Sequence, residues 1–217
     1  MPRNAADTRT RIIDAAEDLF YAEGFRAVSV DAIAERAGVT KRTLYYHFAS
    51  KNELMAAYLD GRDASTMTRY QEWFAKTGEG LPISERIAGI FAKFAEWSSN
   101  PEWKGCGFIR AASELAGEPD HPAVAVASRH KKGFEAWLAG LIAEAGIADS
   151  VLAARRIMLL LDGAASQSLL HRDPSYAEAA IGAVHALLAP GPIAATASTS
   201  ASAMIRPSSA EPLHSPH

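Results

Sequence analysis

Residues 29–51 read SVDAIAERAGVTKRTLYYHFASK, and this stretch decides the fold of the N-terminal part of the chain. Its first half repeats apolar residues at the spacing of one helical face, namely Val30, Ile33, Ala34 and Ala37. Gly38 follows, and glycine is the residue that most readily adopts the left-handed conformation that ends a helix. We therefore predict a short helix over residues 30–37, capped by Ser29 and followed by a glycine turn.

The second half predicts another short helix, which begins after Thr40. The Thr40 hydroxyl can accept a hydrogen bond from the first turn, and Leu44 and Phe48 form one apolar stripe at the spacing i, i+4. The rest of the helix surface is polar or aromatic and consists of Lys41, Arg42, Thr43, Tyr45, Tyr46 and His47. No acidic residue lies between Arg36 and Lys51. A helix with a narrow buried stripe and such an outer face is suited to contact a polyanion.

Two short helices around a glycine turn form a helix-turn-helix. The segment TLYYHF, followed by SKNEL over residues 50–54, resembles the DNA-binding domain of the TetR family of transcriptional regulators. The resemblance covers residues 8–55 and includes an upstream helix that leads to Phe20, Gly24 and Phe25. It implies operator DNA as a partner and, beyond residue 55, a helical ligand domain that matches only in length and helical character.

The remaining sequence predicts helices and no strands. Hydrophobic periodicity and helix-stop residues place them at about residues 8–23, 50–76, 84–99, 108–116, 123–145, 149–171 and 175–188, so that the all-α chain has about nine helices in total. From residue 190 the sequence is Pro, Ala, Ser and Thr with almost no large apolar residue, which predicts disorder. We therefore expect a DNA-binding domain over residues 1–51, an effector-binding and dimerisation domain over 52–189, and a disordered tail over 190–217.

The distribution of charge supports this division. The chain carries a net charge of −3, but residues 1–51 carry a net +1 and the remainder a net −4. A basic face on an acidic body can bind phosphate where it docks and repel it elsewhere, whereas a protein that coats DNA without sequence preference would be basic over much of its surface. With one cysteine, no secretory signal and no apolar run long enough for a membrane span, we expect a cytoplasmic protein.

Each polar residue of the helix-turn-helix has an expected role on DNA. We predict that Arg42 reads a base, because its planar guanidinium can bond O6 and N7 of guanine together. Thr43 could touch a thymine methyl or a base edge, and Lys41 a base or a phosphate. The expected phosphate contacts are Ser29, Tyr45, Tyr46 and His47 and, from the resemblance, Lys51 at the first turn of the next helix. The alternative for Tyr45 is packing between helices.

The middle of the chain holds most of the large aromatic residues, which predicts an apolar effector pocket among the helices between residues 50 and 145. The residues we expect to line it are Tyr70, Phe91, Phe94, Trp97, Phe108 and Phe134, with Arg110, Glu114 and His130 as polar groups. Few ionisable residues fall on the inward faces, so a small, largely apolar ligand is predicted. The alternative is that these aromatics are core.

Dimer formation is expected because one helix-turn-helix covers few base pairs, so that affinity normally comes from a two-fold dimer on a palindrome. The candidate interface is the helix pair over residues 149–188. It carries Met158, Leu161 and Leu169, the small residues 163–166, and an alanine-rich last helix. Packing of these faces within one subunit is the alternative.

Other chemistries are less well supported. Cys106 lies in a GCG turn near Lys104, so one alternative is a sensor of oxidants or electrophiles, but a lone loop cysteine has no resolving partner in the chain. His121 is expected to be an exposed loop histidine, and no spacing resembles a metal ligand set, so no metal or cofactor is predicted. No catalytic arrangement is evident. We therefore expect a transcriptional regulator rather than an enzyme, most simply a repressor released by a small molecule, although activation remains open.

Overall fold

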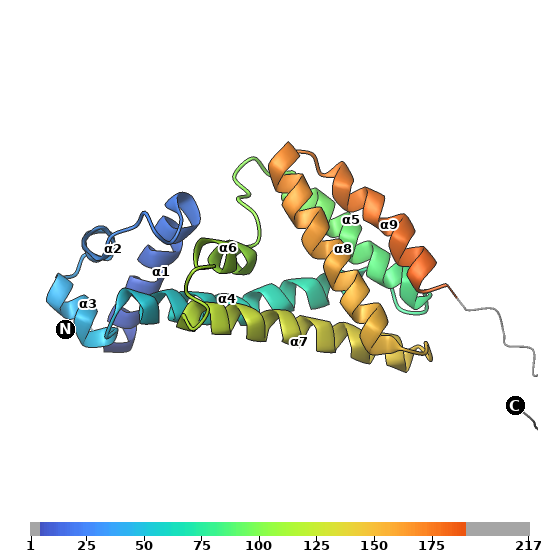
Figure 1. Cartoon of the computed structure of the whole chain (residues 1–217), viewed down its shortest axis with the longest axis horizontal. Helices are drawn as coiled ribbons and strands as arrows, with labels where there is room; N and C mark the ends of the chain where they lie inside the picture. Colours follow the sequence, from blue (N-terminus) through green and yellow to red (C-terminus); the bar gives the residue numbers. More distant parts are fainter. Residues whose placement is uncertain (1–4, 190–217) are drawn as a thin grey trace, which may run out of the picture.

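The computed structural model describes residues 5–189 of the 217-residue chain. Over this range the fold is all-α, as predicted. Its nine helices are α1 (Ala5–Glu23), α2 (Val30–Arg36), α3 (Lys41–His47), α4 (Lys51–Lys76), α5 (Ile83–Ser98), α6 (Gly107–Glu114), α7 (Pro122–Glu144), α8 (Ser150–His171) and α9 (Ser175–Leu187). The molecule is elongated, with α1–α3 at one end and α5, α8 and α9 at the other (Figure 1). The predicted tail over residues 190–217 lies outside the described residues.

The turn between α2 and α3 has the expected geometry. The Ser29 hydroxyl accepts a hydrogen bond from the Ala32 N–H at 3.1 Å, and the Thr40 hydroxyl accepts one from the Thr43 N–H at 3.1 Å. Gly38 has a φ of +62°, which is the left-handed conformation predicted from its position. The side chain of Val39 packs against the core next to it. Both caps and the glycine turn are therefore confirmed.

Helix α1 lies across this pair and fixes it. Its buried face consists of Ile12, Ala15, Ala16 and Phe20. On the same helix, the Arg11 guanidinium donates hydrogen bonds to the carbonyl oxygens of Ala37 and Gly38, at the end of α2. Because the last carbonyls of a helix lack partners within the helix, these bonds satisfy them and hold the turn against α1.

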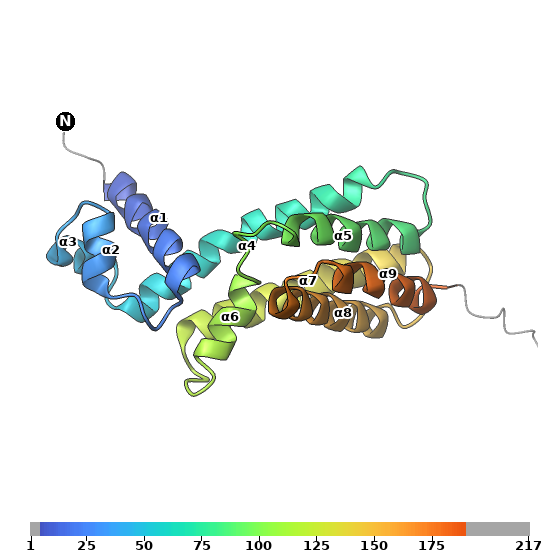
Figure 2. The same ribbon diagram turned by 90° about the horizontal axis from the view of Figure 1, so that it is seen from above.

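Helix α4 connects the two ends of the molecule. The predicted capping box forms, since the Ser50 hydroxyl accepts from the Glu53 N–H at 3.1 Å and the Glu53 carboxylate accepts from the Ala49 N–H at 2.7 Å. The helix is 26 residues long, and α7 packs beside it along the long axis of the molecule (Figures 1 and 2). Any tilt of α4 would therefore move the helix-turn-helix.

Two hydrophobic clusters form the core. The first joins α1–α3 to the beginning of α4, to α6 and to the beginning of α7, and it extends along α4 as far as Leu59. The second joins α5, α8 and α9 to the remaining parts of α4 and α7. The division between these clusters does not follow the chain boundary expected between residues 51 and 52, because α6 and α7 return to the N-terminal cluster.

One local expectation is wrong. His121 is 5% exposed rather than a solvated loop residue, and its Nδ1 accepts a hydrogen bond from the Ala123 N–H at 3.1 Å. The imidazole therefore caps α7, a use of histidine that its loop-like neighbours in sequence do not indicate. No helix within residues 5–189 is long and apolar enough to cross a membrane.

Candidate functional site

The outer face of α3 is exposed to solvent at the end of the molecule. Leu44 and Phe48 are buried, as the i, i+4 stripe predicts, which turns the intervening residues outward. Tyr46 is 82% exposed and Tyr45 45% exposed, so the alternative in which Tyr45 packs between helices is excluded. Arg42 is also exposed, and within the described chain it makes no hydrogen bond or ion pair. Its guanidinium is therefore available to a ligand without the loss of an internal contact.

The other cations of this region are partly neutralised by acids from outside the acid-free stretch. Lys41 forms an ion pair with Asp31 at 3.0 Å, and Arg36 forms one with Asp18 at 2.7 Å. These ion pairs were not predicted from the sequence, because Asp18 lies in α1 and Asp31 in α2, both outside the acid-free stretch. Arg42 is consequently the one cation of α3 without a carboxylate partner among residues 5–189.

Hydroxyl and aromatic groups on the same face are also positioned by local contacts. The Thr43 and Thr40 hydroxyls are 2.8 Å apart, so Thr43 helps to fix the cap as well as facing outward. The rings of Tyr46 and His47 meet edge to face, with their centroids 5.2 Å apart. Ser29 uses its hydroxyl as the α2 cap.

Lys51 lies at the first turn of α4, next to the loop that follows α1. Its Nζ donates to the Arg26 carbonyl at 3.4 Å, a long and weak hydrogen bond. Partial burial lowers its pKa from the ordinary value of 10.5, and the nearby Glu114 carboxylate opposes this shift. The ammonium therefore lies beside the loop after α1, while Lys51 itself is the first residue of α4.

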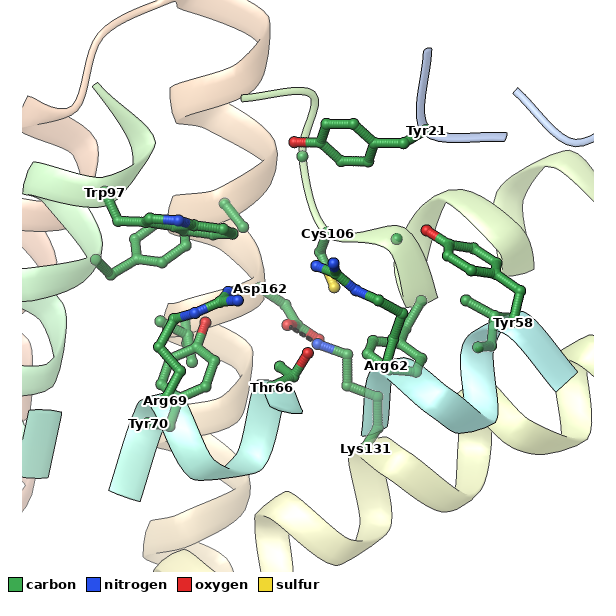
Figure 3. A pocket seen from close by; sticks show the side chains of 17 residues that line it. Tyr21, Tyr58, Arg62, Thr66, Arg69, Tyr70, Trp97, Cys106, Lys131 and Asp162 are labelled. Carbon is green, nitrogen blue, oxygen red and sulfur yellow. Dashed lines mark hydrogen bonds and ion pairs between the residues drawn. The ribbon is translucent and has the colours of Figure 1, made fainter. Parts of the chain in front are cut away.

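A cavity lies where α1, α4, α5, α6, α7 and α8 meet. The space not filled by atoms is about 620 Å³, part of which is open to solvent. Helix α4 supplies more of its side chains than any other helix, and Figure 3 shows how they converge. The lining includes Tyr21, Tyr58, Leu59, Arg62, Thr66, Arg69, Tyr70, Phe94, Trp97, Cys106, Phe108, Lys131, Leu161, Asp162 and Ala165. Of the residues expected in an effector pocket, Tyr70, Phe94, Trp97 and Phe108 are among them.

The other five expected pocket residues do not line this cavity. Phe91 and Phe134 are buried in the second hydrophobic cluster. His130 is buried behind the cavity wall, where its ring stacks on Phe108 with the centroids 3.7 Å apart and its Nδ1 lies 2.7 Å from the Asp63 carboxylate. Burial lowers the pKa of His130. The remaining two residues, Arg110 and Glu114, face the helix-turn-helix end.

Glu114 and Arg110 join α6 to the end of α1 and the loop after it. The Glu114 carboxylate accepts hydrogen bonds from the N–H groups of Phe25 at 2.7 Å and Arg26 at 3.1 Å. Gly24 precedes them with a φ of +94°, and a Cβ there would lie 3.1 Å from the Glu114 carboxylate. The Arg110 guanidinium donates to the Tyr21 carbonyl at 3.1 Å. These contacts form a polar joint between α6 and the helix-turn-helix end.

The polarity of the cavity differs from the sequence prediction. We expected few ionisable groups on the inward faces, but Arg62, Arg69, Lys131 and Asp162 all line the cavity. The signal was present in α4, where residues 58, 62, 66 and 69 recur at three- and four-residue spacing and therefore share one face. The error came from reading only the aromatic residues as inward. Burial raises the pKa of the Tyr58 hydroxyl in this wall to about 12.

Two of these charged side chains have carboxylate partners. Arg62 pairs with Glu17 of α1, and Lys131 of α7 pairs with Asp162 of α8. An open hollow lined by Glu17, Asp18 and Arg36 shares Tyr21, Arg62, Arg69 and Trp97 with the cavity. The cavity therefore opens toward solvent between the helix-turn-helix end and the body.

Cys106 is half-buried in the cavity wall, immediately before α6. Lys104, which the sequence places close to it, instead donates from its Nζ to the Ala22 carbonyl at 3.0 Å. Within residues 5–189 no group of three or more His, Cys, Asp or Glu side chains is arranged to hold a metal ion.

Comparisons with known proteins agree with this architecture. Residues 12–58 match the family model described as bacterial regulatory proteins, tetR family. The regulator SrpR of Pseudomonas putida is 47% identical over 58 residues, a match that spans 27% of each protein. The curated relatives are thus matched over between 27% and 43% of their length.

Solved structures extend the likeness over the whole described fold. A TetR transcriptional regulator from Streptomyces avermitilis is 30% identical with a TM-score of 0.72, and the alignment covers 83% of this chain and 96% of that one. SCO4454, a TetR-family regulator from Streptomyces coelicolor, is 30% identical with a TM-score of 0.70, over 84% and 95% of the two chains. With its helix-turn-helix, its exposed α3 face and these whole-length relatives, the chain belongs to the TetR family, whose members are DNA-binding transcriptional regulators and not enzymes.

Proposed function

We propose that the protein is a homodimeric repressor that leaves a palindromic operator when a small molecule enters the cavity. The observation that carries this proposal is the position of α1, which packs against the helix-turn-helix and also lines the cavity. Tyr21 of α1 is a wall of the cavity, and Glu17 of α1 pairs with Arg62 inside it. A ligand in this space therefore acts directly on a helix that packs against the helix-turn-helix.

On the DNA side, residues 1–51 would supply most contacts. Arg42 would read a base edge in the major groove, with Thr43 beside it and Lys41 on either a base or a phosphate. Ser29, Tyr45, Tyr46, His47 and Lys51 would contact the phosphate backbone. Support comes from the exposure of the α3 face and from the absence of any internal hydrogen-bond or ion-pair partner for Arg42 within the described chain.

Residues 52–189 would bind the effector and form the dimer through α8 and α9. The contact face must differ from the one we expected, because Met158, Leu161 and two of the small residues 163–166, Ala164 and Ala165, are buried within the subunit. The outward stripe of α8 instead carries Leu152, Leu159, Gly163, Ser166 and Leu170. Leu159 is 69% exposed and Leu170 73% exposed in the single chain. Exposed leucines aligned on one helix favour an apolar interface between two copies.

The proposed release mechanism uses α4 and α6 together. A ligand that spreads the wall between Tyr21 and Trp97 would push α1 away from α5 and shift α4, on which the cavity is built. Helix α6 begins at the cavity with Gly107 and Phe108 and ends at the Glu114 joint, so the same displacement reaches Phe25 and Arg26. Release then requires only that the ligand binds the displaced arrangement more tightly than the DNA-bound one.

The direct test is a gel shift with the full chain and the DNA upstream of its own coding region, with random DNA as competitor. We expect a specific complex at moderate salt whose size corresponds to two subunits on one fragment. A Leu159→Glu variant should lower the dimer content and the operator affinity together, because it places a charge on the proposed interface. Absence of a specific complex, or an operator complex that retains a single subunit, contradicts the proposal.

A further inference from the structure

Arg69 is a cation inside the cavity that no group of the described chain neutralises. Its guanidinium lies over the indole of Trp97, 4.8 Å from the ring centroid, and it makes no hydrogen bond or ion pair within residues 5–189 (Figure 3). Its side chain is half-buried, and burial, together with the nearby Arg62, lowers its pKa. Withdrawing a charge from water without a partner costs free energy, so this arrangement is unfavourable until a counter-charge arrives.

The other ionic groups of the cavity cannot supply that counter-charge. Asp162 is the carboxylate of the lining, and it already pairs with Lys131. Glu17 is the acid at the mouth that reaches inward, and it already pairs with Arg62. The lining therefore keeps an excess of positive charge at Arg69.

The walls around Arg69 are flat and apolar. The aromatic rings of Trp97, Tyr70, Phe94 and Phe108 line the same space, and Leu161 closes it on the side of α8. Tyr70 meets Phe134 and Trp73 edge to face, so its ring is fixed by the core behind it. Rigid aromatic walls select a planar apolar body, and a guanidinium with a free donor edge selects a carboxylate or sulfonate, which it can bind with two parallel hydrogen bonds.

From this combination we propose that the effector is a small aromatic anion whose acid group binds Arg69 and whose ring lies between Trp97 and Phe108. This inference rests on the proposed function for its regulatory meaning, but not for the binding step itself. It replaces the largely apolar, uncharged ligand that the sequence predicts. Thr66, one turn before Arg69 on the same face of α4, is a further hydroxyl that the acid group can reach.

The experiment compares three probes that share one ring system and differ in charge: 2-naphthoate, 2-naphthamide and 2-naphthylmethylammonium. Calorimetric titration of the full chain at neutral pH should show 2-naphthoate binding about 10- to 100-fold more tightly than 2-naphthamide, the scale expected for hydrogen bonds to a charged group. The ammonium probe should bind most weakly. In the Arg69→Gln variant the affinity for 2-naphthoate should fall to that of the amide, while the affinity for the amide stays unchanged.

Two further variants control for unfolding of Arg69→Gln and for the loss of an arginine outside the cavity. Arg69→Lys keeps the positive charge without the planar fork and should retain part of the preference for 2-naphthoate, so the charge can be tested even if Arg69→Gln unfolds. Arg129→Gln removes an exposed arginine of α7 that pairs with Asp60 and does not line the cavity, and it should behave as the unmodified protein. Thermal unfolding of each variant confirms that the fold is retained.

The inference is overturned if no probe binds, if the amide or the ammonium binds as tightly as 2-naphthoate, or if Arg69→Gln lowers the affinities for 2-naphthoate and amide equally. Addition of each probe to the operator complex separates the two proposals. Binding of 2-naphthoate that depends on Arg69 but leaves the operator complex intact supports the aromatic anion and contradicts ligand release. If 2-naphthamide releases the operator as effectively as 2-naphthoate does, the result supports ligand release and contradicts the aromatic anion.

Discussion

The exposed surface of α3 and the cavity in the body differ in how they are assembled. The α3 surface comes from one seven-residue helix, in which buried Leu44, together with the buried C-cap residue Phe48, determines the direction of all the others. The cavity draws its walls from α1, α4, α5, α6, α7 and α8, so each of its residues depends on how several helices pack. A local surface can be derived from spacing within one helix, whereas a shared cavity requires the tertiary contacts as well.

The first prediction tests the buried stripe against the outer face of the same helix. Leu44→Ala should lower the free energy of unfolding by about 2–5 kcal/mol, because Leu44 is fully buried and the substitution leaves a space in the N-terminal cluster. Tyr46→Ala, at the most exposed aromatic of α3, should change it by less than about 0.5 kcal/mol while weakening DNA binding. Urea unfolding measures both. Equal destabilisation by the two variants would contradict the division of α3 into a buried stripe that stabilises the fold and an outer face that does not.

The second prediction separates base reading from phosphate binding. Arg42→Ala should weaken binding to the specific operator by about 1–3 kcal/mol and affect random DNA little, since its fork would contact a base edge. Lys51→Ala should instead weaken binding to all sequences alike and reduce the salt dependence by about one counterion. Fluorescence anisotropy over a series of salt concentrations distinguishes these effects. If Arg42→Ala lowers specific and random binding equally, the base-reading role is wrong.

The third prediction concerns the joint between the two regions. Glu114→Ala should destabilise the fold by about 1–2 kcal/mol, because the N–H groups of Phe25 and Arg26 lose a charged acceptor. The matched control is Glu118→Ala, which removes an exposed ion pair with Arg26 and should cost about 0.2–1 kcal/mol. Thermal unfolding with a two-state fit gives the comparison. If Glu118→Ala destabilises the fold as much as Glu114→Ala does, the hydrogen bonds of the Glu114 carboxylate to the main chain do not have the importance that we assign to them.

The smallest expected effect is a dependence of stability on pH that arises behind the cavity wall. His130 is packed against Phe108 and faces Asp63, Lys131 and Asp162, and burial holds its pKa below the ordinary value of 6.5. The unfolded chain therefore binds a proton near pH 6.5 that the folded chain does not yet bind. Stability is fully present above pH 6.5 and falls as the pH drops from there toward the folded-state pKa.

This pH effect is measured by urea unfolding between pH 7.5 and 5. His130→Gln should flatten the loss of stability over that range, although His121, whose pKa burial also lowers, leaves part of it in place. His171→Gln, at an exposed position on the end of α8, serves as the control and should leave the slope unchanged. A slope that His130→Gln leaves unaltered would contradict the role of this imidazole.

Much of the fold followed from the sequence because its signals are local. Apolar spacing, the Ser29, Thr40 and Ser50 caps and the glycine at position 38 each act within a few residues, and all of them are observed. The errors lie where a side chain has a partner far away in the sequence. Glu114, 89 residues after Phe25, was expected in the effector pocket but binds the loop after α1.

The cavity shows the same limit. Hydrophobic spacing along α4 gives a face that includes Arg62 and Arg69, but only the packing of α1 and α5 against that face shows that it is enclosed. Likewise, the buried positions of Met158 and Leu161 on α8 could not be distinguished from an intersubunit surface by composition alone. Both faces of that helix carry large apolar residues, and only packing determines which of them stay exposed.

The Glu114 joint also bears on how such a protein can diversify. Its carboxylate binds main-chain N–H groups of residues 25 and 26, which every residue except proline offers, and it needs only a glycine-like space at position 24. Side chains of α2 and α3 can therefore change without altering the connection to α6. A grafted helix-turn-helix that keeps this glycine and the following backbone path would meet the same carboxylate, so that under the proposed function operator choice and effector choice would be exchangeable as separate modules.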